Sequence, residues 1–332
     1  MGSPLFARRE LVLLGVETPL LVPSFSSRGY PELSDLFAML RGALRDVALV
    51  SAYDLHFGAL PPDAADVADV VVVDSGGYEA RAGGDLSEPY LDERVGRVWT
   101  ANDYGRLLDR LAPTTLRLVV SFDGLEATPL DAQIGDATAR LGSRGLAIDM
   151  LLKPEARGDT WLDIARVVRV ADRLAQFAAV GVTEKELGAS PLERCSALVR
   201  LRQGLAAVGL GLPIHVFGCL TPLAITAYFL CGADIFDGLA WLRFAFDVVP
   251  GYIGELAIAT GAWRDPDSTR HRQQCLDNLA VLRRLQRALR GFCTTNDVAL
   301  LRACAALGPN LLQVFELVRA AGAWAPEMND ER

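Results

Sequence analysis

Three aspartates each stand at or near the end of an apolar run. Asp74 follows four consecutive valines, Asp123 ends the run LRLVVSFD (116–123), and Asp237 lies within ADIFDGLAW (233–241). Continuous apolar runs are typical of strands buried on both faces, as in a parallel sheet. Carboxylates gathered at one edge repel one another. We therefore expect them to bind a cation or a donor-rich substrate, or to have raised pKa values.

The stretch VVVVDSGGYEA (70–80) joins the first of these acids to a glycine pair and an aromatic residue. Gly76 and Gly77 allow a tight turn and a close approach of the backbone to a ligand. An alternative interpretation of Asp74 is a cap for the following helix. A metal ion bound by the three aspartates is a second alternative.

The histidines and cysteines give no support to a hydrolase of the Ser/His/Asp or Cys/His type. His215 precedes the end of its apolar run, and we expect it to be buried within a strand. His56 and His271 have no partner at the spacing of metal ligands.

Carboxylates and an aromatic ring could act together on a nucleoside. One carboxylate attacks the anomeric carbon of the sugar as positive charge develops, and another shuttles the proton of the leaving base. A third accepts hydrogen bonds from the N–H donors of a purine edge, while an aromatic ring stacks on its face. Asp237, Asp74, Asp123 and Tyr78 would fill these four roles.

Apolar runs alternate with segments of helical periodicity along nearly the whole chain. The expected strands are 20–25, 47–54, 70–74, 116–123, 146–153, 178–183, 213–218 and 233–239. The expected helices are 31–44, 99–111, 130–141, 161–177, 192–208, 222–231, 275–290 and 297–320, after a hairpin or leading strand within 10–22. This alternation predicts an α/β protein built as a (β/α)8 TIM barrel. An open, doubly wound sheet is the alternative, but no G-x-G-x-x-G motif follows the first strand.

Residues 1–262 are expected to form the catalytic barrel, and residues 263–332 a C-terminal helical extension packed on it, basic at its start. Functional residues of such barrels lie at the C-terminal ends of the strands. The three aspartates fall at the ends of the third, fourth and eighth expected strands.

The composition is typical of a folded protein with a large core, since 51% of the 332 residues are hydrophobic and 22% are charged. No window approaches the roughly 18 apolar residues that span a bilayer, so no membrane association is expected. The N-terminal residues do not resemble a signal peptide. Most of the six cysteines lie in apolar segments, which is typical of free thiols in a reducing compartment. These features predict a cytoplasmic protein.

A net charge of −8 excludes a global basic field that would attract nucleic acid. Arginines are nevertheless concentrated between positions 264 and 290. This patch either faces phosphates or is the solvated side of a helix, and both interpretations stay open. The candidates for contact with nucleic acid are Arg243, Arg264, Arg270 and Arg272.

Several segments together resemble the tRNA-guanine transglycosylase (queuine tRNA-ribosyltransferase) family. The family motif D-S-G-G-[FY]-Q is similar to DSGGYE (74–79), F-D-E to SFDG (121–124), and M-F-D-C to IFDG (235–238). TPLLVPSFSSRG (18–29) and VALVSAYDLHFG (47–58) resemble the family's T-P-x-F-M-P-V-G-T and I-I-L-x-N-T-Y-H-L stretches. The similarity is weak but runs in order along nearly the whole chain. It implies a (β/α)8 enzyme that exchanges guanine for a 7-deazaguanine base, as in queuosine formation.

The resemblance also implies roles for single residues. Asp237 would be the nucleophile that forms a covalent ribosyl intermediate, and Asp74 the general acid and base. Asp123 would read a guanine-like base on which Tyr78 stacks. Further residues matching the family's substrate site are Ser75, Gly76, Gly77, Glu79, Lys153, Gly181, Phe217 and Gly218. No cofactor is implied.

The chain departs from the family in two respects. The family's C-x-C-x2-C zinc site with its later histidine is missing, since only Cys275 stands in that region and no histidine follows His271. Zinc is therefore predicted to be absent. The family's glutamine after the aromatic residue is Glu79, and Lys153 and Lys185 follow the fifth and sixth expected strands. The lysines form local ion pairs with glutamates, or Lys153 contacts a substrate phosphate or the base.

The partners implied are a nucleic acid, either DNA or tRNA, and a purine or 7-deazapurine base. Loss of the zinc module favours a substrate other than ordinary tRNA, and relatives of the family act on DNA. One alternative function is a glycosidase or transferase for free nucleosides or nucleotides. Another is a non-catalytic partner subunit of a transglycosylase. Family members often form homodimers, so a second copy or a partner protein is also an expectation.

Overall fold

A computed structural model describes residues 4–326, except 29, 31, 81–96, 112–114, 125, 247–250, 253–254, 256–257, 260, 262–263 and 265. Eight parallel strands close into a barrel in the order β10-β3-β4-β5-β6-β7-β8-β9. They are β3 (Leu20–Phe25), β4 (Val47–Ser51), β5 (Val70–Asp74), β6 (Leu116–Val120), β7 (Ala147–Leu152), β8 (Ala179–Thr183), β9 (Ile214–Phe217) and β10 (Ile235–Gly238). Because β10 pairs with β3, the barrel is confirmed and the open sheet is excluded.

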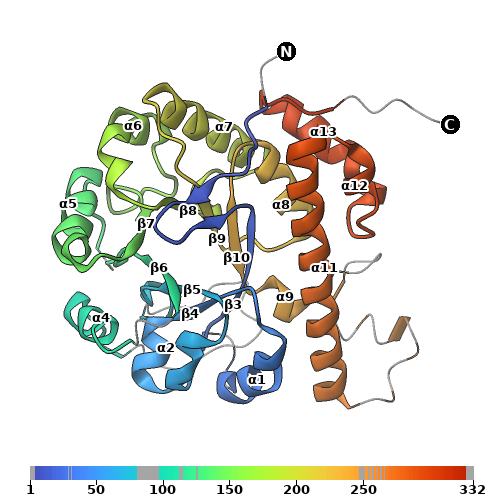
Figure 1. Cartoon of the computed structure of the whole chain (residues 1–332), viewed down its shortest axis with the longest axis horizontal. Helices are drawn as coiled ribbons and strands as arrows, with labels where there is room; N and C mark the ends of the chain where they lie inside the picture. Colours follow the sequence, from blue (N-terminus) through green and yellow to red (C-terminus); the bar gives the residue numbers. More distant parts are fainter. Residues whose placement is uncertain are drawn as a thin grey trace.

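Helices surround this barrel, as Figure 1 shows. They are α1 (Leu33–Leu40), α2 (Ala52–Phe57), α3 (Gly77–Ala80), α4 (Ala101–Leu108), α5 (Leu130–Leu141), α6 (Ile164–Arg169), α7 (Pro191–Ala207), α8 (Pro222–Leu230), α9 (Ala240–Arg243), α11 (Asp267–Thr295), α12 (Val298–Arg302) and α13 (Leu311–Ala320). A short two-stranded sheet, β11 (Phe244–Ala245) with β12 (Gly251–Tyr252), follows α9. None of the described helices is both long and apolar enough to cross a membrane.

Alternate residues of the strands fill the barrel interior. Val22, Leu49, Val72 and Leu118 belong to one buried apolar cluster inside the barrel, while their neighbours along each strand pack outward against the helices. This two-sided burial explains why the strands appear in the sequence as continuous apolar runs. The hairpin of β1 (Glu10–Leu11) and β2 (Val16–Glu17) adds Leu11 to the interior cluster at the N-terminal end of the strands.

Most strand ends lie within two residues of the predictions, but two differ by three residues. β4 stops at Ser51 rather than at 54, because the chain turns into α2 there. β6 stops at Val120 rather than at 123. The backbone N–H of Ser121 still donates to Asp149, but its hydroxyl accepts the N–H of Leu151, so a side chain replaces a backbone carbonyl. Asp123 therefore lies in a loop beyond the strand.

Three expected helices differ clearly from their predicted bounds. The expected helix 161–177 is the shorter α6 followed by a 3-10 helix, the expected helix 275–290 is the longer α11, and the expected helix 297–320 is divided into α12 and α13. α11 runs along the barrel beside α1 and α8 (Figure 1). The side chain of Gln286 accepts a hydrogen bond from the backbone of Leu21, at the start of β3. The C-terminal helices thus pack on the barrel, while the division at 262/263 lies outside the described residues.

Candidate active site

The C-terminal ends of β5 and β10 and the loop after β6 bring the three predicted aspartates within electrostatic range. Burial and the neighbouring charge of Glu79 raise the pKa of Asp74 to about 7, and the charges of Asp237 and Asp123 act in the same direction. The backbone N–H of Gly76 donates to Asp74 at 2.9 Å and partly opposes this shift of the pKa. A carboxyl group with this pKa can both give and take a proton near neutral pH.

Asp237 is surrounded by hydrogen-bond donors. Its Oδ2 accepts from the hydroxyl of Ser24 at 2.8 Å, and its Oδ1 accepts from the backbone N–H of Gly218 at 3.1 Å. Ser24 is held in turn by the backbone N–H of Gly238 at 3.0 Å. Asp237 is only 6% exposed, so these donors act in a medium that screens charge weakly. The arrangement stabilises and orients a carboxylate.

His215 is the residue that the sequence analysis missed. It is buried in β9 as expected, but it lies between two carboxylates rather than in an apolar wall. Its Nδ1 is 2.6 Å from Oδ2 of Asp149 on β7, and its Nε2 is 3.3 Å from Oδ1 of Asp237. These carboxylates raise the pKa of His215 to about 9 against the opposing effect of burial. The available signal was Asp149, an acid in the middle of the apolar run AIDMLL.

The segment Ser75-Gly76-Gly77 (the SGG motif) positions Asp123, which lies beyond the end of its own strand. Its backbone N–H donates to the buried hydroxyl of Ser75 at 3.1 Å. A Cβ atom on Gly77 would come within 2.8 Å of the Asp123 side chain, so this position requires glycine. Gly76 has a φ of +85° and sits against Tyr53 and Trp99. The motif thus supplies backbone shape, and Ser75 positions an acid.

Glu79 does not point to solvent but joins three strand ends. Its carboxylate accepts hydrogen bonds from Ser26 after β3 and from Ser51 of β4, the second at 2.9 Å. Burial and the charge of Asp54 raise the pKa of Glu79 to about 7. Asp54 in turn accepts the backbone N–H of Ser27. The residue that breaks the family pattern is therefore part of a buried carboxyl cluster.

Tyr78 lies at the rim with Arg28 against it. The guanidinium carbon of Arg28 is 4.6 Å from the centre of the Tyr78 ring, and Arg28 also donates to the Tyr78 carbonyl. The predicted stacking of a base on this ring therefore requires the face opposite Arg28 or a displacement of Arg28.

Phe217 stacks on His215, and Gly181 lies against Phe217 and Asp149. The rings of Phe217 and His215 are stacked at 3.8 Å. A Cβ on Gly181 would come within 2.6 Å of Phe217 and 2.9 Å of Asp149, so its hydrogen leaves room for both.

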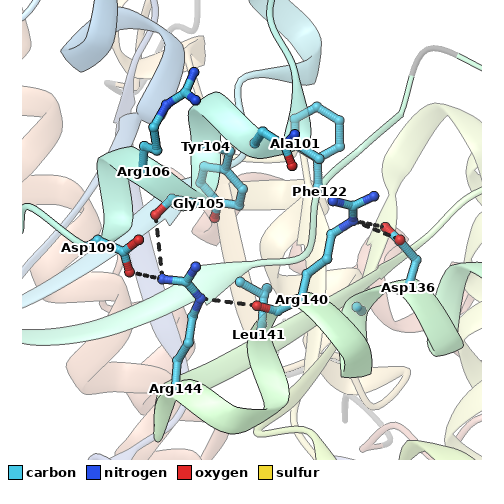
Figure 2. Close-up of a pocket in the computed structure, with 12 residues that line it drawn as sticks. Ala101, Tyr104, Gly105, Arg106, Asp109, Phe122, Asp136, Arg140, Leu141 and Arg144 are labelled. Atoms are coloured by element: carbon cyan, nitrogen blue, oxygen red, sulfur yellow. Dashed lines mark hydrogen bonds and ion pairs between the residues drawn. The ribbon is translucent and has the colours of Figure 1, made fainter.

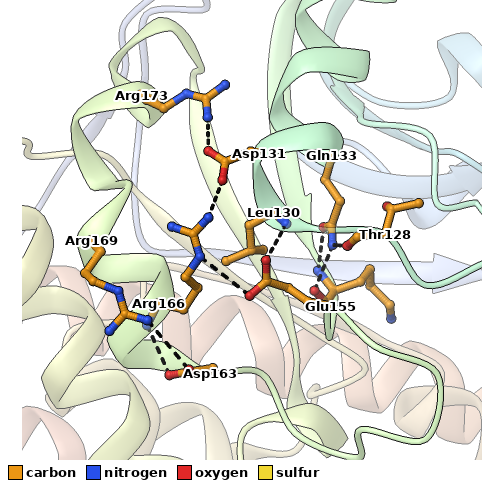
Figure 3. A network of polar contacts seen from close by, with 10 residues as sticks. Thr128, Leu130, Asp131, Gln133, Glu155, Asp163, Arg166, Arg169 and Arg173 are labelled. Atoms are coloured by element: carbon orange, nitrogen blue, oxygen red, sulfur yellow. Dashed lines mark hydrogen bonds and ion pairs between the residues drawn. The ribbon is translucent and has the colours of Figure 1, made fainter.

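Lys153 forms a local ion pair with a glutamate, which is one of the two interpretations drawn from the sequence. Its Nζ is 2.6 Å from Glu186, 3.1 Å from the hydroxyl of Thr183, and 3.9 Å from Oδ2 of Asp123. Gln133 of α5 accepts the backbone N–H of Lys153 and donates to the Lys153 carbonyl. Figure 3 shows Gln133 near the ion pair of Asp131 and Arg166, which links α5 and α6. Lys153 thus reaches Asp123, whereas Lys185 is an exposed residue of the loop after β8.

The arginine patch divides along α11. Arg283 and Arg290 donate to backbone carbonyls near the N-terminal ends of β4 and β3, so they hold the helix on the barrel. At the other end of α11, the side chain of His271 contacts the carbonyl of Leu242 in α9, directly after β10. The nucleic-acid candidates are near this end, with Arg264 and Arg272 exposed and Arg243 and Arg270 partly buried.

No group of three metal-binding side chains occurs among the described residues. Cys275 is buried in α11, where burial raises the pKa of its thiol to about 12. The absence of zinc stays a prediction. A surface pocket of about 370 Å³ lies between α4 and α5, lined by Tyr104, Arg106, Arg140 and Arg144 among others (Figure 2). Its arginines pair with Asp103, Asp136 and Asp109, and it is separate from the aspartates of the barrel mouth.

Comparisons with known families and proteins identify no relative of this chain. No protein-family model matches the sequence, and no curated protein is significantly similar to it.

Proposed function

We propose that this protein is a transglycosylase that exchanges a guanine for a 7-deazaguanine base in nucleic acid. The observation that carries the proposal is the pairing of two carboxyl groups with different environments. Asp237 accepts hydrogen bonds from Ser24 and Gly218, and Asp74 has a pKa raised to about 7 by burial and by neighbouring negative charge. Two acids whose environments differ in this way can serve as nucleophile and proton carrier.

In the first step, an oxygen of Asp237 attacks C1′ of the nucleotide as the bond from C1′ to the base nitrogen breaks. The electron pair of that bond leaves with the base, and Asp74 in its protonated form supplies the proton that neutralises it. The product is a glycosyl ester of Asp237, with Asp74 ionised.

In the second step, the ring nitrogen of the incoming base attacks C1′ and the ester bond breaks. The proton of that nitrogen passes to ionised Asp74, and Asp237 recovers its negative charge. Both groups return to their starting states, so the exchange needs no cofactor. The nucleic acid and the two bases supply every atom that changes place.

Asp123 would read the base. Its carboxylate can accept the amide and amino protons of a guanine edge, and Lys153 lies 3.9 Å away, so that a polar substituent could contact both side chains. Arg243, Arg264, Arg270 and Arg272 would contact the phosphate backbone near the mouth. All six cysteines are free thiols, which supports a reducing, cytoplasmic location.

An exchange assay tests the proposal. The protein is incubated with radiolabelled guanine and, in parallel, with tRNA, duplex DNA, single-stranded DNA or a free nucleoside. We expect label to enter one nucleic acid, and Asp237→Asn to lower the rate at least about 10³-fold. The matched control Asp136→Asn, an exposed acid of α5 paired with Arg140, should retain the full rate.

Three outcomes would contradict the proposal. Label in the free nucleoside alone would favour the nucleoside enzyme. No label in any acceptor would favour a partner subunit. Full exchange by Asp237→Asn would remove the assigned nucleophile.

A further inference from the structure

His215 lies at the centre of a row of three charged groups that crosses the barrel interior. Asp149 on β7, His215 on β9 and Asp237 on β10 are joined by contacts of 2.6 Å and 3.3 Å. Asp149 and His215 are fully buried and Asp237 nearly so. Burying three ionisable side chains in such a place lowers stability, because removing charges from water is unfavourable. This cost indicates that the row has a function.

We propose that His215 is a positioning residue for Asp237, held by Asp149 so that its imidazolium places positive charge beside Oδ1 of the nucleophile and orients that carboxylate. This inference rests on the proposed function, in which Asp237 is the nucleophile.

The geometry gives each ring nitrogen a separate task. The contact between Nδ1 and Asp149 is the shorter one, so this pair fixes the ring and its charge. Nε2 makes no hydrogen bond among the described residues and lies 3.3 Å from Oδ1 of Asp237. At this distance the ring acts on Asp237 through its charge, and no hydrogen bond from the ring occupies Oδ1.

Few other ionisable groups act on the row of Asp149, His215 and Asp237. The groups that face His215 are Asp149 from β7 and Asp237 from β10, while β8 presents only Gly181 and the ring's own strand presents Phe217. Asp74 and Cys219 interact with Asp237, and Tyr104 interacts with Asp149. Burial raises the pKa of the Cys219 thiol and of the Tyr104 hydroxyl well above their usual values, so both are neutral at neutral pH.

The row also assigns chemistry to the two oxygens of Asp237. Among the described residues, Oδ1 accepts from Gly218 and lies near His215, whereas Oδ2 accepts only from Ser24. In the glycosyl ester, Oδ2 would bond to C1′ and Oδ1 would become the carbonyl oxygen. When the bond between C1′ and Oδ2 breaks, its electron pair stays on Oδ2 and the charge is shared with Oδ1, where Gly218 and His215 would stabilise it.

Nuclear magnetic resonance tests the row without any substrate. The chain has three histidines, so the full-length protein labelled with ¹⁵N-histidine gives a spectrum that can be assigned with single variants. We expect the pKa of His215 to be about 9 and to fall in both Asp149→Asn and Asp237→Asn. The control Asp136→Asn should leave it unchanged. A His215 that is neutral at pH 7, or whose titration ignores Asp237→Asn, would overturn the proposal.

Kinetics then separates positioning from folding. His215→Gln keeps an N–H donor without charge, and His215→Phe removes both. We expect kcat to fall about 100-fold in His215→Phe and less in His215→Gln, with KM nearly unchanged. The additional loss of activity above pH 9 should be absent in both variants, while the decline that follows the ionisation of Asp74 remains. Variants that fold and retain the wild-type kcat and pH profile would contradict the role. Absence of exchange in the wild-type protein would remove the proposed function alone, since the titration shows the row independently.

Discussion

The proton on Asp74 depends on residues that do not touch the reacting atoms. Glu79 is the strongest of the charges that raise the pKa of Asp74, and Glu79 is itself affected by burial and by Asp54. The hydroxyls of Ser26 and Ser51 hold Glu79 in place. The carboxyl cluster behind the SGG motif thus sets the pH range in which Asp74 can act as an acid.

Replacing Glu79 by glutamine tests this coupling. Glu79→Gln keeps hydrogen bonds to both serines but removes a negative charge, so the pKa of Asp74 should fall. Since the first chemical step needs protonated Asp74, its rate should begin to decline at a pH lower by roughly one unit. Single-turnover rates across pH 5–9 measure this.

The control for that measurement is Glu316→Gln, an exposed acid on α13 far along the chain. It should leave the pH profile unchanged. An unaltered profile in Glu79→Gln, or a decline moved to higher pH, would show that Glu79 does not act through Asp74.

At the scale of elements, the sequence predicted the strands better than the site. A strand buried on both faces forms a continuous apolar run, so β3 and β5 were predicted with their observed bounds. The ends of β4 and β6 were missed, because Ser51 and Ser121 use side-chain hydrogen bonds where the sequence suggested further strand.

The site itself was predicted only in part, for a related reason. Asp74 and Asp237 stand where local sequence shows a strand ending in an acid. The row from Asp149 to Asp237 depends on β7, β9 and β10, which are separated in sequence and come together only when β7, β8, β9 and β10 pair side by side in the sheet. No spacing rule within one segment contains that information.

Packing of β8 against β9 offers a second prediction. Gly181→Ala would place a Cβ within 2.6 Å of Phe217 and 2.9 Å of Asp149. We expect it to lower the free energy of unfolding by ~1–3 kcal/mol, because the ring stack on His215 must shift in a close-packed interior. Urea unfolding followed by circular dichroism measures the change.

Gly135→Ala provides the matched control, since it lies in α5 and a Cβ added there would have no heavy atom within 4 Å. It should raise the free energy of unfolding by ~0.5–1 kcal/mol. Equal stability changes in the two variants would show that the space around Gly181 is not close-packed.

The whole molecule is acidic, yet one long helix has two basic regions with different surroundings. Arg283 and Arg290 anchor α11 near the N-terminal side of the barrel, while Arg272 lies beside His271, which contacts α9 at the catalytic end. A nucleic acid that reaches Asp237 must pass the catalytic end. Only that part of the arginine patch is expected to contact phosphates.

Paired arginine variants test whether phosphates contact only the catalytic end of α11. Arg264→Gln with Arg272→Gln should weaken binding of the substrate nucleic acid. The slope of log Kd against log salt concentration should become smaller by the amount expected for the loss of about one to two phosphate contacts. Arg284→Gln with Arg287→Gln, two exposed positions further along α11, removes the same charge and should change the salt dependence less. Equal effects would indicate a purely global charge response.

The most direct test of the whole account is the covalent intermediate. The protein is mixed with the nucleic acid that takes up label, without added base, quenched in acid within one turnover, and analysed by mass spectrometry. The account predicts an adduct of the nucleic acid on Asp237, absent in Asp237→Asn. An adduct on another residue, or base exchange by a protein that never forms one, would contradict it.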